Sequence, residues 1–311
     1  MKRTDEKLKK KLAESFGPSV KLDEPMARHI RFQVGGPADI YFTPENKAEL
    51  VRFLSEVNGK GLELNVIGRG TNLLVKDGGI RGVVISMTCG FRETSWIETG
   101  GQTRLRLGAS VSMDDAVDQC VHKGMAGLEF AAGIPGNVGG AVVMNAGTRE
   151  GDVAGTVRRV HFIDLEGSAY EMDREQIRFE YRSANLTTDM IVIGAEFGLE
   201  PGSETEIKRK ADLLLQWRKQ NHPIHLPCAG SVFKNPGKIP AGRLIDEAGL
   251  KGIKIGRAAV SDLHTNFIVN LGGATAGQIL DLVRLVHRTV RERTGVYLEP
   301  EIKILGEELN G

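Results

Sequence analysis

The chain has 311 residues, of which 41% are hydrophobic and 26% charged, and this balance excludes a disordered chain. The 41 Lys and Arg residues nearly equal the 40 Asp and Glu residues, so the net charge of +1 excludes a charge-driven nucleic-acid binder as the first interpretation. Three cysteines are too few for a disulfide framework or a four-cysteine zinc site, and no run of about 18 apolar residues occurs. We expect a cytoplasmic protein with no metal and no membrane segment.

The first part of the chain is expected to alternate helices and strands. An N-terminal helix precedes a strand at 38–42, and Thr43-Pro44 then supplies an N-cap and a proline suited to the first helical position. Apolar residues at helical spacing continue this helix as far as Gly59. Further strands are predicted at 64–67, 73–76 and 82–87.

A second block contains a strand at 105–107 and a helix at 113–123, which Ser112 caps and Gly124 ends. A stretch of small residues follows from 131 to 147. Strands are then predicted in an antiparallel meander, at 157–164, 169–172 and 190–199.

Pro201-Gly202 marks a boundary, because the next four residues have the spacing of a capping box and open a long helix that ends near Gln220. A separate unit is expected after it. Its predicted elements are a helix at 242–248, strands at 258–260 and 267–270, a helix at 276–293 whose capping box starts at Thr275, and a terminal strand at 297–305.

The first glycine loop, Gly68-Arg69-Gly70-Thr71-Asn72-Leu73, begins like a dinucleotide fingerprint. Leu73 stands where the third glycine belongs, and a strand rather than a helix is predicted next, so a Rossmann interpretation fails. Backbone N–H groups at such a turn can still bind phosphate oxygens. Taken alone, an ordinary glycine-rich hairpin is the commoner explanation.

The second glycine loop runs from Ala132 through Gly133-Ile134-Pro135-Gly136, then Gly139-Gly140, to Asn145-Ala146-Gly147. Side chains this small let a ligand lie against the main chain, whose free N–H groups can neutralise a pyrophosphate. Tight packing between elements also favours Gly and Ala, so that alternative stays open. Two such loops without a P-loop lysine favour a dinucleotide ligand.

Six segments in collinear order cover almost the whole chain and carry a family resemblance. They are HIRFQVGGPA (29–38), IGRGTNLLV (67–75), LEFAAGIPGNVGGAVVMNAG (128–147), FEYRS (179–183), AGSVFKNP (229–236) and YLEPEIKILG (297–306). Together they resemble the UDP-N-acetylenolpyruvoylglucosamine reductase family, flavoenzymes that complete UDP-N-acetylmuramate in bacterial peptidoglycan synthesis. One departure is visible, because Gln33 stands where a basic residue is expected.

The resemblance implies an α+β fold with an FAD-binding region of the vanillyl-alcohol-oxidase type in two subdomains, plus a smaller α+β substrate-binding domain. The implied parts are residues 1–93 and 94–200 for the two FAD-binding subdomains, 201–298 for the substrate-binding domain, and 299–311 for a tail closing the site. The compact stretch between Pro201 and Glu299 resembles the family's shorter form. The two glycine loops would hold the diphosphate of non-covalent FAD, since neither has a His or Cys immediately beside it.

The family reaction adds hydride to one carbon of an enolpyruvyl double bond and a proton to the carbon bearing the carboxylate. The resemblance implies that Arg182 holds the substrate carboxylate, a role suited to the bidentate guanidinium group. It makes Ser231 the proton donor and Glu301 the carboxyl group that polarises the substrate. Glu299 is the alternative to Glu301, because period-two alternation puts both on one face of the predicted strand.

Substrate-binding positions are implied at Tyr181, Lys234 and Asn235, the last matching a position that contacts the substrate diphosphate. The basic residues at 208–210 and at Arg218-Lys219 would steer an anionic nucleotide, although such runs more often form a solvated face. His222 and His225 have no Cys or carboxylate at metal-ligand spacing, so no metal site is expected.

The expected partners are two small molecules, UDP-N-acetylglucosamine enolpyruvate and the co-substrate NADPH. No nucleic acid and no membrane is expected as a partner, and the protein is expected to be a monomer. Two alternatives stay open. Another flavoenzyme on the same scaffold, such as a hydroxy-acid oxidase, would consume oxygen with its own substrate. A nucleotide-binding module without catalysis would stay colourless when FAD is added.

Overall fold

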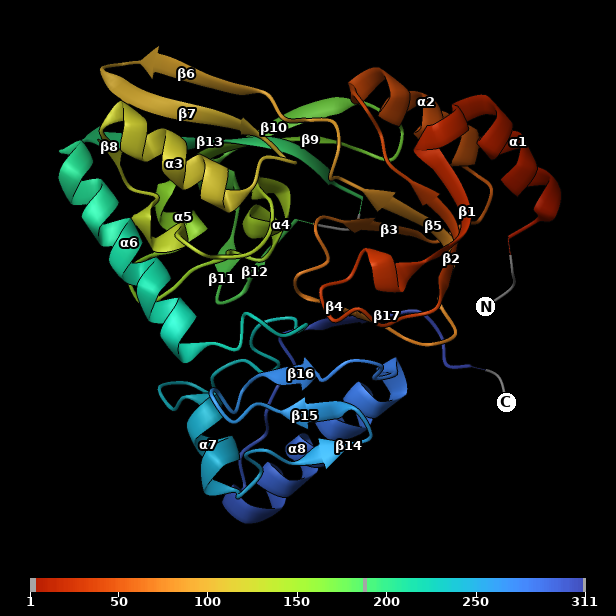
Figure 1. The fold of residues 1–311 in the computed structure, drawn as a ribbon. Helices are drawn as coiled ribbons and strands as arrows, with labels where there is room; N and C mark the ends of the chain where they lie inside the picture. The colour runs from red at the N-terminus through yellow and green to blue at the C-terminus, as the bar shows by residue number, and fades with distance from the viewer. Residues whose placement is uncertain (1–3, 187–188, 310–311) are drawn as a thin grey trace.

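A computed structural model describes residues 4–186 and 189–309, which form three units (Figure 1). The first unit has a four-stranded sheet in the order β1-β2-β5-β3, in which β1 is antiparallel to β2 and the other pairs are parallel. Its elements are α1 (Glu6–Phe16), β1 (Val20–Pro25), β2 (Pro37–Phe42), α2 (Lys47–Val57), β3 (Leu64–Ile67) and β5 (Ile80–Ser86). Both helices pack on the sheet through one core, in which Phe42 stacks on Phe53 with ring centroids 3.8 Å apart.

The start of α2 differs from the prediction. Asn46 caps the helix by accepting a hydrogen bond from the Glu49 N–H at 3.0 Å, so the helix begins at Lys47 rather than after Thr43. Thr43 and Pro44 instead follow the end of β2 and hydrogen-bond to other segments. The Thr43 N–H donates to the Ser19 carbonyl, and the Pro44 carbonyl accepts from the Gly90 N–H. An asparagine three residues before an acidic residue is a stronger cap than the sequence interpretation allowed.

The second unit is built on an antiparallel sheet in the order β10-β9-β13-β7-β6, with β8 pairing to the end of β13. Its strands are β6 (Thr94–Thr99), β7 (Gln102–Gly108), β8 (Met125–Ala126), β9 (Val157–Ile163), β10 (Ala169–Asp173) and β13 (Ile191–Pro201), with a small hairpin of β11 (Phe179–Glu180) and β12 (Ser183–Ala184). Its helices are α3 (Met113–Lys123), α4 (Val138–Val143), α5 (Val153–Thr156) and α6 (Glu204–Asn221). The predicted caps of α3 are confirmed: Ser112 accepts from Asp115, and Gly124 is left-handed.

The third unit packs a small sheet, ordered β14-β15-β16, against two helices (Figure 1). Its elements are α7 (Ala241–Glu247), β14 (Lys254–Ile255), β15 (Ala258–Val260), β16 (Ile268–Asn270) and α8 (Ala276–Thr294). The Thr275 cap of α8 is confirmed, since its hydroxyl accepts from the Gln278 N–H at 3.2 Å. The terminal strand is shorter than predicted, because β17 covers only Lys303–Leu305, and Pro300, which has no N–H to donate, lies before it.

The first and third units share a hydrophobic core, which combines buried residues of 26–84 with buried residues of 228–302. β17 pairs in parallel with β4 (Leu73–Val75) of the first unit. Asp77 accepts hydrogen bonds from the first two N–H groups of α8, at 2.9 Å from Ala276 and 2.8 Å from Gly277. The core therefore crosses the predicted boundaries at 93 and 201. Within the described ranges, no helix has the length and hydropathy needed to cross a lipid bilayer.

Candidate active site

Arg182 and Glu301 face each other where the second and third units meet. The Arg182 Nε lies 3.1 Å from the Glu301 Oε1, and their side chains are 23% and 15% exposed. Arg182 follows the short strand β11 and has a φ of 60°, a left-handed backbone that an arginine rarely adopts. Strain of this kind persists where the surrounding structure fixes it, and it clusters at functional sites. The structure thus brings together two of the three predicted catalytic residues.

The structure separates Glu301 from its alternative, Glu299. Burial raises the pKa of the Glu301 carboxyl group, and the nearby charges of Arg182 and Lys234 only partly oppose this rise. Glu299 is 61% exposed and forms an ion pair with Lys234, with 2.7 Å between Nζ and Oε1. Residues 299–302 are not a regular strand, so the expected shared face does not form. A buried carboxyl group with a raised pKa fits hydrogen-bond donation to an anion.

Ser231 lies beside the same carboxylate through the backbone. The Glu301 N–H donates to the carbonyl of Val232, the residue after Ser231, at 2.8 Å. The buried Asn266 fixes this segment, because its Oδ1 accepts from the Phe233 N–H and its Nδ2 donates to the Phe233 carbonyl. Gly230 has a φ of 75°, and a Cβ there would meet open space. The backbone around Ser231 is therefore fixed, and the neighbouring Gly230 leaves open space beside it.

The three predicted substrate-binding residues adjoin this pair, and all three have partners within the protein. The Asn235 Nδ2 donates to the Tyr181 hydroxyl at 3.3 Å, and its Oδ1 accepts from the Ala241 N–H at the start of α7. Tyr181 is half exposed, and its ring lies beside the Arg182 guanidinium, 5.0 Å from centroid to Cζ. Lys234 is engaged by Glu299. A diphosphate would have to compete with these partners or rearrange them.

The first glycine loop leaves a row of backbone donors without partners. Among the described residues, none accepts a hydrogen bond from the N–H groups of 69–72. Consecutive free N–H groups in a turn form an anion-binding concavity. The loop also reaches the catalytic pair, because the Asn72 Nδ2 donates to the Glu301 carbonyl at 3.1 Å. Gly70 is a packing glycine, since a Cβ there would lie 2.3 Å from the His29 carbonyl oxygen.

The second glycine loop differs more from its prediction. Residues 138–143 form the helix α4, and the N–H groups of Val138 and Gly139 donate to the carbonyls of Val111 and Ala109, so neither is free for a pyrophosphate. The Asn145 side chain donates to the Glu180 carbonyl at 3.0 Å, two residues before Arg182. Gly147 also serves packing, because a Cβ there would lie 2.5 Å from Asp152. Part of this loop therefore supports the catalytic segment.

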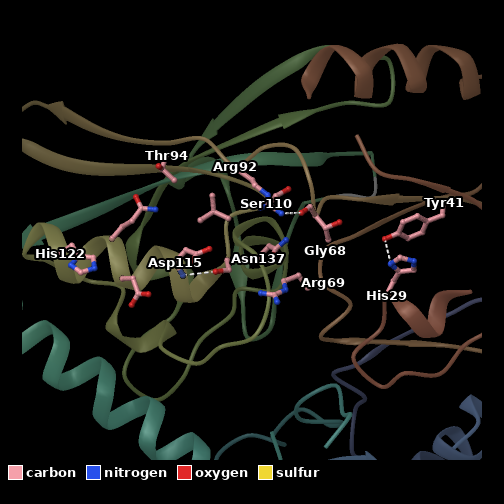
Figure 2. Close-up of a pocket in the computed structure, with 15 residues that line it drawn as sticks. His29, Tyr41, Gly68, Arg69, Arg92, Thr94, Ser110, Asp115, His122 and Asn137 are labelled. Atoms are coloured by element: carbon pink, nitrogen blue, oxygen red, sulfur yellow. Dashed lines mark hydrogen bonds between the residues drawn. The ribbon is translucent and has the colours of Figure 1, made fainter. Parts of the chain in front are cut away.

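The two loops touch, and a large cavity opens at one end of their contact. The Thr71 hydroxyl donates to the Pro135 carbonyl at 3.2 Å. The cavity has a volume of about 1000 Å³ and lies between the first and second units (Figure 2). Its lining is His29, Tyr41, Gly68, Arg69, Thr88, Arg92, Thr94, Ser110, Val111, Ser112, Asp115, Asp118, Gln119, His122 and Asn137. Of the predicted cofactor-binding residues, only Gly68 and Arg69 are among them.

Two buried polar atoms in the lining of this cavity indicate that it holds a ligand. The Ser110 Oγ and the Asn137 Oδ1 have no hydrogen-bond partner among the described residues. Buried polar groups in native proteins are nearly always satisfied, so such orphans require an explanation. A ligand with hydroxyl groups and ring nitrogens, such as the nucleotide part of FAD, would supply one. The sequence interpretation named neither as a site residue, although Asn137 lies within the second glycine loop.

His29 and Tyr41 close the other side of the cavity (Figure 2). The His29 ring is held at both nitrogens, by Glu24 at 2.9 Å and by the Tyr41 hydroxyl at 3.0 Å. A ring engaged at both nitrogens is poorly placed for covalent attachment to a flavin. The side chains of Arg69 and Arg92 also line the cavity and supply positive charge there. The cavity thus has the size and the polar groups for a nucleotide, although Asp115 and Asp118 also line it.

Comparisons with known proteins agree with this geometry. A model described as FAD binding domain matches residues 38–173, and one described as UDP-N-acetylenolpyruvoylglucosamine reductase, C-terminal domain, matches residues 222–305. The chain is 38% identical to the reductase of that name from Syntrophus aciditrophicus, covering 97% of this chain and 96% of that one. It is 41% identical to the one from Clostridioides difficile, with 93% and 94% covered.

A solved structure, the UDP-N-acetylenolpyruvylglucosamine reductase from Thermus caldophilus, superposes with a TM-score of 0.78 at 35% identity, covering 92% of this chain and 98% of that one. The predicted fold class is confirmed by this likeness and by the match to the FAD binding domain. Identity above 30% over nearly the full length of several relatives establishes the family. The chain therefore belongs to the UDP-N-acetylenolpyruvoylglucosamine reductase family of FAD-dependent oxidoreductases.

Proposed function

We propose that this chain reduces UDP-N-acetylglucosamine enolpyruvate to UDP-N-acetylmuramate with NADPH, through non-covalently bound FAD, as a step of peptidoglycan precursor synthesis. The observation that carries the proposal is the pairing of Arg182 with Glu301 at 3.1 Å, beside Ser231 and at the end of the loop 68–73. These residues come from segments far apart in the chain. A guanidinium group, a carboxyl group with a raised pKa and a hydroxyl beside open space match the needs of an enolpyruvyl reduction.

FAD, when bound, takes hydride from NADPH and supplies it to the substrate alkene. The residues suited to hold it are the free N–H groups of 69–72, together with Ser110, Asn137 and Arg69 at the cavity. Because loop 68–73 joins this cavity to Glu301, its Gly68 end serves the cofactor and its Asn72 end serves the catalytic pair.

Arg182 is proposed to hold the substrate carboxylate. An enol ether resists hydride unless the attached carboxylate accepts electron density, so the site must stabilise the charge that develops on it. The Nε of Arg182 already contacts Glu301, which leaves its terminal nitrogens for the carboxylate. A protonated Glu301 would add a donor to the same oxygens, whereas an ionised one would repel them.

Ser231 is proposed to give the proton to the carbon that bears the carboxylate. A hydroxyl is a weak acid, but toward a strongly basic enolate carbon within hydrogen-bond reach it is sufficient. Gly230 gives this turn its left-handed backbone, with a φ of 75°, and leaves open space beside Ser231. The proton then moves from Ser231 to the product, and solvent restores it.

The experiment is a pair of anaerobic half-reactions. NADPH should bleach the flavin of the purified protein, and UDP-N-acetylglucosamine enolpyruvate should then restore the yellow colour. The Ser231→Ala variant should be bleached at a nearly normal rate and lose reoxidation by the sugar nucleotide. The exposed Ser203→Ala variant is the control and should behave as the wild type. If both half-reactions fall together in Ser231→Ala, the proton-donor role is wrong.

The cofactor mode, the division of the chain and the cellular setting belong to the same proposal. Acid precipitation should release the yellow colour into the supernatant if the FAD is not covalently attached.

We propose a monomer that acts in the cytoplasm, with residues 1–93 and 94–200 as FAD-binding parts, 201–298 as the substrate-binding part and 299–311 as the closing tail. Sedimentation at micromolar concentration tests the monomer directly.

A further inference from the structure

Arg218 lies in the last turn of α6 and reaches over the second glycine loop. A Cβ on Gly133 would lie 3.0 Å from the Arg218 Cδ and 3.8 Å from its Nε. The side chain therefore lies against the backbone of the loop, in a space that exists because residue 133 has no side chain. This position is half buried, unlike that of its neighbour Lys219, which is exposed.

The Arg218 guanidinium forms no hydrogen bond or ion pair with a carboxylate of the described residues, whereas Arg209 on the same helix pairs with Glu206. The nearby carboxylate of Asp114 is engaged by the Gly133 N–H at 3.1 Å. Burial lowers the pKa of Arg218, the positive charge of Arg182 lowers it further, and Asp114 opposes the two only in part. A half-buried cation beside a like charge is unfavourable unless a ligand compensates it.

The charges around Arg182 and Glu301 indicate which kind of ligand would compensate the positive charge of Arg218. Lys234 is neutralised by Glu299, and Glu301, the partner of Arg182, is a carboxyl group whose pKa is raised by burial. Arg182 and Arg218 thus leave excess positive charge at one site. The substrate carboxylate accounts for Arg182 in the proposed function. A second anionic group is needed for Arg218, whose charge interacts with that of Arg182.

We infer that Arg218 binds a phosphate group of an incoming nucleotide substrate, and so positions that substrate at the Arg182–Glu301 pair. The inference rests on the proposed function, in which both substrates, the nucleotide sugar and NADPH, carry a diphosphate. A guanidinium group is well suited to phosphate, which it contacts through two parallel donors. Arg218 approaches the site from α6, outside the segments that carry the predicted catalytic residues.

The test compares Arg218→Gln with Lys219→Gln, which removes the same charge from an exposed position in the same helical turn. Anaerobic stopped-flow experiments give, for each half-reaction, an apparent Kd and a limiting rate. Arg218→Gln should raise the apparent Kd by about tenfold to a hundredfold, the loss of a charged hydrogen bond, with the limiting rate within about twofold. Lys219→Gln should leave both values unchanged.

The two half-reactions identify the source of the phosphate. A higher Kd for NADPH alone assigns Arg218 to the diphosphate of NADPH. A higher Kd for the sugar nucleotide alone assigns it to the diphosphate of that substrate. Higher Kd values for both substrates indicate a shared subsite. Unchanged Kd values in both reactions would overturn the inference, as would a fall in the limiting rates alone. Loss of FAD from Arg218→Gln would also overturn it, because the cation would then serve the cofactor.

A binding measurement separates this inference from the proposed function. Inorganic pyrophosphate and UDP should raise the thermal unfolding midpoint of the wild type and of Lys219→Gln, because a ligand that binds only the folded state stabilises it. The rise should be smaller for Arg218→Gln. If the wild type fails to turn over the sugar nucleotide, the proposed function fails, while this shift still reports whether Arg218 binds phosphate. Equal shifts in all three proteins would show that it does not.

Discussion

The side chain of Asn72 donates to the main-chain oxygen of Glu301 at 3.1 Å, and this bond joins the first glycine loop to the residue proposed to polarise the substrate. The same residue accepts from the Lys303 N–H at 3.0 Å, next to the pairing of β17 with β4. Asn72 therefore holds the backbone on both sides of Ile302. The family resemblance assigned Asn72 to the cofactor, and in the structure its amide group donates to the backbone of Glu301.

Replacing Asn72 by alanine should lower kcat by about tenfold, the effect of losing roughly one hydrogen bond in positioning, with little change in KM. FAD content should stay near one per chain, because the backbone N–H groups of 69–72 do not depend on this side chain. Visible absorbance and steady-state kinetics give the two values. Asn65→Ala, a partly exposed asparagine on β3 whose amide donates to the Glu63 side chain, is the matched control. Loss of FAD in Asn72→Ala would instead support the cofactor-binding role.

In the Arg182→Lys variant, the rate of flavin reoxidation by the sugar nucleotide should fall by about a hundredfold or more, because a point charge replaces two parallel donors to the carboxylate. Bleaching by NADPH should be much less affected. Arg178→Lys serves as the control, because Arg178 lies just before the same hairpin and is 78% exposed. Single-turnover reoxidation at saturating sugar nucleotide measures the loss. A fully active lysine variant would contradict the proposed grip on the carboxylate.

His222 gives the protein a stability that depends on pH. Burial lowers its pKa to about 4, helped by His264 and Arg218, and its ring packs among Trp217, His264 and Phe267. The unfolded chain binds a proton near the ordinary value of 6.5, so the stabilisation is full above that pH and is lost as the pH falls toward 4. The loss amounts to about 2 kcal/mol for this half-buried group.

The His222→Gln variant should therefore show a shallower fall in the free energy of unfolding between pH 6.5 and 4 than the wild type. Urea unfolding at several pH values provides the measurement. His225→Gln removes an exposed histidine of the same segment and should retain the wild-type slope. An identical slope in His222→Gln and the wild type would show that protonation of His222 does not oppose folding.

The Asp77 cap of α8 should stabilise the contact between the first and third units. Asp77→Ala removes both acceptors at the N-terminus of this helix and should cost about 1–2 kcal/mol of stability. Asp281→Ala, which removes an exposed carboxylate on the same helix, should cost less than about 0.5 kcal/mol. Chemical denaturation compares the two variants. Equal costs would mean that the cap across the two units contributes nothing beyond a surface charge.

Local signals were predictable from the sequence where a few neighbouring residues decide the structure. Ser112 and Gly124 bound α3 as expected, because a hydroxyl cap and a left-handed glycine act within one turn. The helix α4 was not predicted, since Val138–Val143 contains two glycines and a β-branched run with low helix propensity. Packing overrides that propensity: a Cβ on Gly139 would lie only 3.0 Å from the Ala109 Cβ.

The site shows the same limit. The motif containing Arg182 and the one containing Glu301 could be named from family segments, but only the fold shows that burial favours Glu301 over Glu299. Ser110 has no distinguishing neighbours in sequence and Asn137 lies within the second glycine loop, but only the fold shows that a polar atom of each is buried with no partner among the described residues. Asn145 was assigned to the cofactor by its motif, and only the fold shows that its amide also donates to the carbonyl of Glu180. Contacts between distant segments were the ones that the sequence could not predict.

The core shared by the two chain ends has a consequence for biosynthesis. β4 pairs with β17, so Leu73 leaves the ribosome long before its partner Lys303 exists. Until then, the apolar residues of 26–84 that contact 228–302 have nothing to cover them. The second unit, which has its own core, can fold in the meantime. The nascent protein therefore exposes an apolar surface until residues 228–302 have been synthesised. Chaperones should accordingly bind mainly to the first quarter of the chain.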